Sequence, residues 1–129
     1  MPIFVVGAHL KGLPLNAQLT ELGAVLVREA RTAAEYRFYA FQDGAIKKPG
    51  LVRIAEGSQD VGVSVPGEVW ALPLGAWGTF LSYIPLPLGI GKIKLDDGSQ
   101  VHGFLMEAAH IPECTDISDV GGWRRYTDN

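Results

Sequence analysis

The chain has 129 residues, 47% of them hydrophobic and 19% charged, and its formal net charge is −3. This length fits a single domain over residues 1–129, and the charged fraction is too low for a disordered chain. A negative net charge without a cluster of basic residues argues against nucleic acid as a partner. The sequence also contains no apolar run of about 18 residues that could span a membrane.

Cysteine usage and the first residues indicate the compartment. Cys114 is the single cysteine, so an internal disulfide cannot form. The first residues also lack the charged, apolar and small-residue regions of a secretory signal. Because disulfides are rare in reducing compartments, we expect a cytoplasmic protein.

In chain order, the first predicted elements are a strand, a glycine-containing turn and a helix. Residues 3–6 form an apolar run typical of a buried strand. The leucines after the turn recur at helical spacing and predict one helix: Leu15, Leu19, Leu22 and Leu26. Asn16 is a candidate N-cap for this helix, and Gly23 within it indicates close packing against a neighbour.

The rest of the chain predicts strands with short connections. Alternating or aromatic-rich patterns favour strands at residues 36–41, 51–54, 61–65, 69–71, 93–95 and 101–105. Pro49-Gly50 predicts a break before one strand, and Asp97-Gly98 is typical of a hairpin turn. Residues 74–88 are apolar, but Pro85 and Pro87 prevent a regular element through them. One N-terminal helix and about six strands indicate an α+β fold, with a mostly antiparallel, barrel-like sheet.

The stretch from Phe4 to Asn16 is the strongest indication of a functional site. An apolar strand meets a glycine turn and then opens into a helical pattern. Such an entry can direct backbone N–H groups at an anion, and it places the ring of His9 at the edge of the same turn.

Seven strings in order along nearly the whole chain carry a family resemblance. They are residues 6–10 (Val-Gly-Ala-His-Leu), 13–16 (Leu-Pro-Leu-Asn), 30–33 with 36–37 (Ala-Arg-Thr-Ala and Tyr-Arg), 48–51 (Lys-Pro-Gly-Leu), 68–73 (Glu-Val-Trp-Ala-Leu-Pro), 84–91 (Ile-Pro-Leu-Pro-Leu-Gly-Ile-Gly) and 121–124 (Gly-Gly-Trp-Arg). Together they resemble the C-terminal domain of allophanate hydrolase. The resemblance implies a fold similar to γ-glutamyl cyclotransferases, with a pocket at the first Gly-rich loop.

The resemblance also implies a role in urea and allophanate nitrogen metabolism. In that family this domain is assigned to help decarboxylate the N-carboxycarbamate that a preceding amidase domain releases. The amidase domain's Ser-Ser-Lys set is not present here, so we expect no allophanate hydrolysis from this chain alone. The histidine associated with decarboxylation matches His9, which is our candidate acid/base if the chain is an enzyme.

Removal of CO2 from a carbamate nitrogen needs a proton donor and groups that hold the carboxylates. His9 suits the first role near neutral pH. The candidate binding residues are backbone groups of the turn, charged side chains and two hydrogen-bonding side chains: Gly7, Ala8, Leu10, Gly12, Asn16, Arg31, Tyr36, Lys48 and Glu68. No spacing resembles a zinc or calcium motif, and we expect no metal or other cofactor.

Each candidate also has a purely structural interpretation. His9 can be a turn residue satisfied by backbone, and Arg31 and Lys48 can be ordinary surface charges. Tyr36 suits the core or its rim. Glu68 is explained best by a salt bridge with Arg31 or Arg37.

Two other functions stay open beside a role on a small carboxylate or carbamate-like metabolite. A non-catalytic binding or assembly module for a separate amidase is the first, and the sequence leaves open whether the chain forms a homodimer. γ-Glutamyl cyclotransferase activity is the second. γ-Glutamyl cyclotransferases use an acidic residue as the general base, in a stretch that the resemblance aligns with residues 77–80. These four residues contain no carboxylate, which disfavours that activity.

Overall fold

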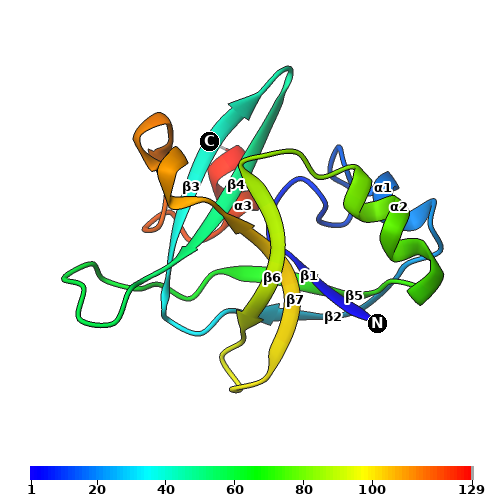
Figure 1. Cartoon of the computed structure of the whole chain (residues 1–129), viewed down its shortest axis with the longest axis horizontal. Coiled ribbons are helices and arrows are strands. Elements are labelled where there is room, and N and C mark those ends of the chain that lie inside the picture. The colour runs from blue at the N-terminus through cyan, green and yellow to red at the C-terminus, as the bar shows by residue number, and fades with distance from the viewer. Residues whose placement is uncertain (129) are drawn as a thin grey trace.

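The computed structural model describes residues 1–128, which form two β-sheets with short helices around them (Figure 1). The larger sheet has five strands in the order β2 (Val25–Arg31), β5 (Pro66–Ala71), β1 (Pro2–Val5), β7 (Gln100–Met106) and β6 (Leu88–Lys94). The smaller has three, in the order β4 (Ile46–Arg53), β3 (Tyr36–Asp43) and β8 (Thr115–Asp116). The helices are α1 (Ala17–Thr20), η1 (Leu74–Ala76), α2 (Trp77–Ser82), η2 (Ala108–Glu113) and α3 (Trp123–Thr127).

The strand pairing confirms the α+β, mostly antiparallel prediction. Of the pairs within residues 1–128, β1 with β7 is parallel and the other named pairs are antiparallel. The larger sheet curls strongly, and its edge strands meet at one end. There, Thr32 bridges Leu95, and the Ala33 N–H donates to the Lys94 carbonyl at 2.9 Å. The sheet is therefore barrel-like without being closed along its length.

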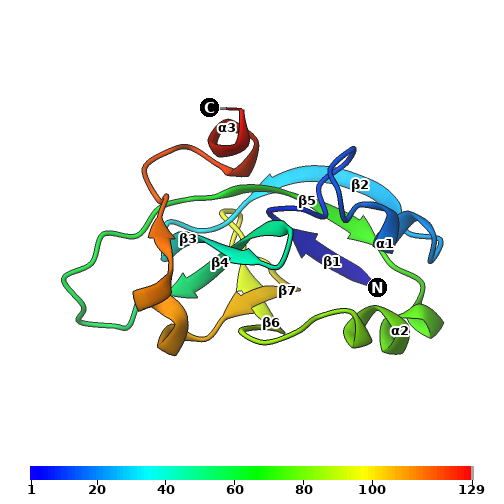
Figure 2. The ribbon, with the colours of Figure 1, turned by 90° about the horizontal axis from the view of Figure 1, so that it is seen from above.

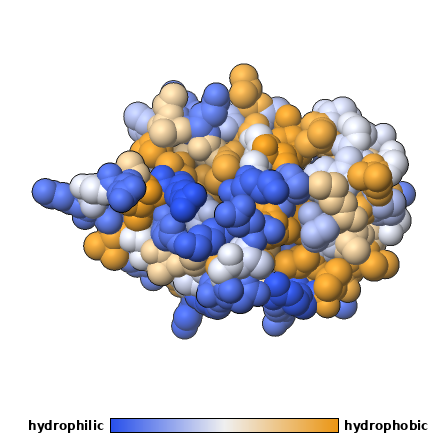
Figure 3. All heavy atoms as spheres, turned by 60° about the horizontal axis from the view of Figure 1, so that its bottom comes forward, coloured by the Kyte–Doolittle hydropathy of each residue, from blue (hydrophilic) through white to orange (hydrophobic). Residues whose placement is uncertain are grey.

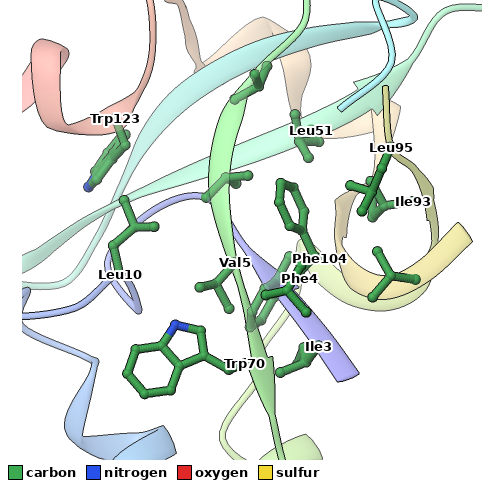
Figure 4. Packing of buried hydrophobic residues seen from close by; sticks show 14 of the residues in the cluster. Ile3, Phe4, Val5, Leu10, Leu51, Trp70, Ile93, Leu95, Phe104 and Trp123 are labelled. Carbon is green, nitrogen blue, oxygen red and sulfur yellow. The ribbon is translucent and has the colours of Figure 1, made fainter. Parts of the chain in front are cut away.

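The β1–β5 pair has buried side chains on both faces. Successive side chains of a strand point to opposite faces, so Ile3 and Val5 face one way and Phe4 the other. Figure 4 shows Trp70, Leu10 and Trp123 on one side of this pair, and Ile93, Leu95 and Leu51 on the other. Burial on both faces fixes the register of β1 and, with it, the start of the turn that follows.

The predicted helix over the leucine pattern is wrong beyond its first turn. The structure has a helix at Ala17–Thr20, and the following residues from Val25 pair with β5 as a strand. Gly23 has φ +84°, a left-handed conformation that ends the helix instead of packing within it. Leu19 is fully buried, but Leu26 lies in the exposed edge strand β2. Sheet pairing has overridden the helical periodicity here.

The strand predictions are confirmed except at two places. Val63 makes an isolated bridge to Tyr36, and residues 61–65 are not a strand. Pro49 and Gly50 lie inside β4 instead of breaking it. Because β4 is an edge strand, a proline there removes no necessary ladder hydrogen bond. The predicted hairpin is present as β6 and β7, and residues 74–88 contain η1 and α2.

The helices lie at separate places around the sheets. Figure 2 shows α3 and α2 on opposite sides of the molecule. Figure 3 shows apolar residues at several places on one face of the molecule, with hydrophilic residues between them. Large apolar side chains are exposed in β2 and in the segment after β5: Val25, Leu26, Val27, Leu74, Leu81, Tyr83 and Leu86. Within residues 1–128, no helix is long and apolar enough to span a membrane.

Candidate functional site

The turn after β1 is held by hydrogen bonds within the segment itself. The Leu10 N–H donates to the Gly7 carbonyl at 2.9 Å, and the Leu15 N–H donates to the Ala8 carbonyl at 2.8 Å. Asn16 occupies the N-cap position of α1, as predicted, but its side-chain amide donates to the His9 carbonyl at 2.8 Å and does not cap the helix. The carbonyl groups of Gly7, Ala8 and His9 thus accept hydrogen bonds from later residues of the same segment.

The backbone N–H groups at the start of the same turn differ from its carbonyl groups, because they do not donate to other groups in the described part of the chain. Among the hydrogen bonds of residues 1–128, none has the backbone N–H of Gly7, Ala8 or His9 as its donor. Backbone N–H groups without a protein acceptor are good donors for a carboxylate.

The His9 ring is packed between aromatic rings and anchored at one nitrogen. It stacks on Phe104, with ring centroids 5.0 Å apart, and meets Phe80 edge to face at 5.5 Å. Its Nε2 lies 2.7 Å from the side-chain oxygen of Gln18. Because an amide oxygen only accepts, Nε2 carries the proton and Nδ1 keeps its lone pair.

This environment keeps His9 neutral at neutral pH. Burial lowers the pKa of His9 from 6.5 to about 4; the hydrogen bond to Gln18 opposes this shift, and the positive charge of Lys48 adds to it. An anion bound beside the ring would act in the opposite direction and favour the protonated ring.

The His9 hollow, as we call the cavity beside this ring, is mostly apolar. It is lined by residues of the turn, α1, β4 and the α2–β6 segment: Val5, Val6, Gly7, Ala8, His9, Leu15, Gln18, Lys48, Pro49, Tyr83, Ile84, Pro85, Leu88 and Phe104. It is partly open to solvent, and its volume of about 30 Å³ has room for about two water molecules. Among these lining residues there is one cation, Lys48, and no carboxylate.

Gly7 and Lys48 bring β4 to this hollow. A Cβ on Gly7 would lie 2.1 Å from Cγ of Pro49, so only glycine allows this approach of β4. The Lys48 ammonium lies 2.7 Å from the Asp43 carboxylate, and its side chain is 12% exposed. The positive charge of Lys48 contributes to the lowered pKa of His9, and the ion pair with Asp43 offsets part of that charge.

The structure brings together only part of the predicted site. Gly7, Ala8 and Lys48 line the His9 hollow with His9. Tyr36 does not reach it, because its ring is fully buried in the core and its hydroxyl accepts from the Lys94 N–H.

Two other predicted binding residues also serve different roles. Gly12 is exposed with φ +81°, and Asn16 supports the turn through the His9 carbonyl. Gly12 thus shapes the backbone, and Asn16 fixes the turn from outside the lining of the hollow.

The remaining predicted residues lie on a second hollow, between β2, β5 and the start of α3. Leu10, Arg31 and Glu68 line it, and its volume is about 590 Å³. Arg31 bonds to Ser64, and the expected salt bridge of Glu68 with Arg31 or Arg37 is wrong, since Arg124 is its partner at 3.2 Å.

Sequence reasoning missed the residues that surround the His9 ring. Gln18, Phe80, Tyr83 and Phe104 come from α1, α2, the segment after it and β7. The spacing of Gln18 from His9 across one turn offered a weak signal. Phe80 and Phe104 are indistinguishable from core residues in the sequence.

Comparison with known proteins places this geometry in a family. The family model for the allophanate hydrolase C-terminal domain matches residues 1–128. The urea amidolyase of Lachancea kluyveri is 39% identical over 127 residues, which cover 96% of this chain and 7% of that protein. The chain thus spans a small part of the curated relatives that it matches.

Solved structures agree with this assignment. An allophanate hydrolase of Kluyveromyces lactis superposes with a TM-score of 0.92 at 36% identity, over 99% of this chain and 21% of that one. A protein of uropathogenic E. coli gives a TM-score of 0.87 at 38% identity, over 99% of this chain and 95% of that one. The former relative is much longer than this chain, and the latter has nearly the same length.

The fold is that of the γ-glutamyl cyclotransferase-like proteins, as the resemblance implied. A γ-glutamyl cyclotransferase of 13% identity superposes with a TM-score of 0.56 over 89% of this chain, which shows a shared fold alone. Within this fold class, the family match and the relatives above are more specific. The chain belongs to the allophanate hydrolase C-terminal domain family.

Proposed function

We propose that this chain binds a small carboxylate or carbamate anion in the His9 hollow and assists decarboxylation of N-carboxycarbamate. The observation that carries this proposal is a neutral His9 beside Lys48, in an apolar hollow at a turn with unengaged N–H donors. Family membership supports the reaction class, because relatives are named allophanate hydrolase and urea amidolyase.

The binding step follows from charge and solvent exclusion. N-carboxycarbamate carries two carboxylates on one nitrogen. Lys48 offsets one negative charge, and the N–H groups of Ala8 and His9 donate to carboxylate oxygens. The apolar walls disfavour localised carboxylate charge, which promotes its conversion into neutral CO2.

The chemical step needs one proton. As the C–N bond breaks, its electron pair stays on nitrogen, CO2 leaves, and the nitrogen takes a proton to give carbamate. The bound dianion raises the pKa of His9 from about 4, so the ring is protonated at Nδ1 in the complex. His9 then donates this proton to the nitrogen and returns to its neutral form.

The hollow must widen before such a ligand enters. Its volume of about 30 Å³ is too small to hold both carboxylates of the ligand inside the hollow. Tyr83 lines the hollow and is 42% exposed, so its ring can swing outward at little packing cost. We expect binding to move this wall.

Calorimetric titration with malonate, a stable dicarboxylate, tests the binding step. Wild type and His110→Ala should bind it saturably, because His110 lies beside Phe41 and outside the lining of the hollow. His9→Ala should bind at least several-fold more weakly. The reaction itself is tested by supplying N-carboxycarbamate from an amidase and comparing CO2 release. Equal CO2 release with wild type and His9→Ala would refute the catalytic role.

A second candidate function is assembly with an amidase. The urea amidolyase and allophanate hydrolase relatives are much longer than this chain, and β2 exposes Val25 and Val27 at 60% and 56%. Exposed apolar residues of an edge strand suit a protein contact. Gel filtration with a purified amidase tests this. Co-elution that Val25→Lys abolishes would support it, and separate elution would count against it.

Cyclotransferase activity is not favoured. The lining of the His9 hollow contains no carboxylate to act as the base. We expect no 5-oxoproline from γ-glutamyl dipeptides, and its formation would overturn this expectation.

A further inference from the structure

Two side chains from distant parts of the sequence bind the backbone of Lys11, one at its N–H and the other at its carbonyl. The Lys11 N–H donates to Oε1 of Glu68 at 2.8 Å. The Lys11 carbonyl accepts from a guanidinium nitrogen of Arg124 at 2.8 Å, and the same nitrogen lies 3.2 Å from Oε2 of Glu68. Glu68, Arg124 and the backbone N–H and carbonyl of Lys11 thus form one closed set of contacts, which we call the Lys11 clamp.

Glu68 is fixed in place by burial. It lies in β5 opposite Val5 of β1 and is 5% exposed. The indole N–H of Trp70 donates to its Oε1 at 3.1 Å, in addition to the Lys11 N–H. A buried carboxylate is stable only with such donors, so its position and that of the Lys11 N–H are coupled.

Arg124 reaches the clamp because α3 packs closely on β5. Gly122 has φ +122°, and a Cβ there would lie 2.6 Å from Cγ of Pro66. Trp123 is 3% exposed and meets Phe38 edge to face, so it anchors the first turn of α3 in the core. The Gly-Gly-Trp-Arg string therefore delivers one guanidinium to the turn that carries His9.

We propose that Glu68 and Arg124 are positioning residues that set the direction of the N–H groups of the His9 turn. Lys11 is two residues after His9, and its backbone is held from outside the turn by the clamp. This inference rests on the proposed anion site, because its benefit is a preorganised set of donors for the ligand. Neither side chain lines the His9 hollow, so both act through the turn.

Arg124→Met and Arg125→Met form a matched pair that tests the clamp. Both arginines are exposed residues of α3, so neither substitution removes core packing, and the contacts with Lys11 and Glu68 belong to Arg124. In Arg124→Met we expect hydrogen exchange of the Lys11 amide to rise roughly tenfold and the malonate Kd to rise about three- to tenfold. Arg125→Met should leave both at the wild-type values.

Glu68→Gln tests the other half of the clamp. A glutamine can keep Oε1 toward Lys11 and Trp70, but it then presents an NH2 group to Arg124. We expect the same weakening of malonate binding as in Arg124→Met, without an additive effect in the double variant. If Glu68→Gln does not fold, Arg124→Met alone decides.

The His9 ring provides a readout that does not depend on ligand binding. Loosening of the turn should expose the ring and move its pKa upward in Arg124→Met, as seen by NMR titration. An unchanged His9 titration with faster Lys11 exchange would overturn the positioning role, and so would equal effects of Arg125→Met. Failure of the wild type to bind malonate would refute the proposed function. Hydrogen exchange of the Lys11 amide and NMR titration of His9 would still test the positioning role of Glu68 and Arg124.

Discussion

The Nε2 atom of His9 and the side-chain oxygen of Gln18 lie 2.7 Å apart, and this contact joins the turn after β1 to helix α1. It assigns the proton of the neutral ring to Nε2 and leaves Nδ1 as the atom that can gain one. It also opposes the lowering of the His9 pKa by burial. Gln18 therefore controls both the tautomer and the ease of protonation of the candidate acid.

Substitution of Gln18 should move the His9 pKa in opposite directions. Gln18→Leu removes the hydrogen bond that raises this pKa, so we expect a value below about 4. Gln18→Glu places a carboxylate at the ring, which favours the imidazolium and should raise the pKa above the wild-type value. NMR titration of the His9 ring signals measures the pKa in both variants. Shifts of the same sign in the two variants would contradict this account.

The neutral His9 should make stability fall in acid. Its pKa is about 4 when folded and 6.5 in the unfolded chain, so between these values the unfolded state binds more protons. The contribution of neutral His9 to the free energy of unfolding is fully present above about pH 6.5. It decreases by about 3 kcal/mol as the pH falls to about 4. Urea unfolding of wild type and His9→Asn at pH 7 and pH 4 isolates the effect. We expect a smaller loss in His9→Asn.

Local patterns predicted most strands because these segments obey simple rules of burial. The aromatic-rich strand at β3 and the hairpin at Asp97-Gly98 are both present. The helix over the leucines failed because Leu22 and Leu26 fit a helical period by chance. Gly23 turned the chain, and pairing with β5 decided the structure of the residues that followed.

The site was predictable where the chain itself brings residues together. Gly7, Ala8 and His9 are neighbours in one turn, and Lys48 follows from the family string. Gln18 and Arg124 were missed because their roles depend on distances that only the folded sheet sets. Arg124 is 56 residues from Glu68, and no periodicity relates the two. The function of these residues stays a prediction.

Lys48 should influence His9 and the ligand in separable ways. Without a ligand, its charge lowers the His9 pKa, so Lys48→Met should raise that pKa toward 6.5. With malonate, loss of the same charge should weaken binding roughly tenfold, as expected for a partly buried charge pair. NMR titration and calorimetry measure the two effects. Lys47→Met is the matched control, because Lys47 is exposed on the same strand and does not line the hollow. If Lys47→Met and Lys48→Met weaken malonate binding equally, the local role of Lys48 is wrong.

Gly7 should be essential to the packing that forms the hollow. A methyl group at this position would meet the ring of Pro49 at 2.1 Å, and both residues belong to packed backbone segments with little freedom to move. We expect Gly7→Ala to destabilise the fold by about 1–3 kcal/mol, as overpacking of a core does, and to displace β4 with Lys48. Urea unfolding gives the stability change, and chemical shifts of residues in β4 report the displacement. Gly75→Ala is the control, since no atom lies within 4 Å of the Cβ that it would add. A Gly7→Ala protein with wild-type stability and unchanged β4 signals would show that the turn and β4 can separate without loss, and that the hollow does not depend on their contact.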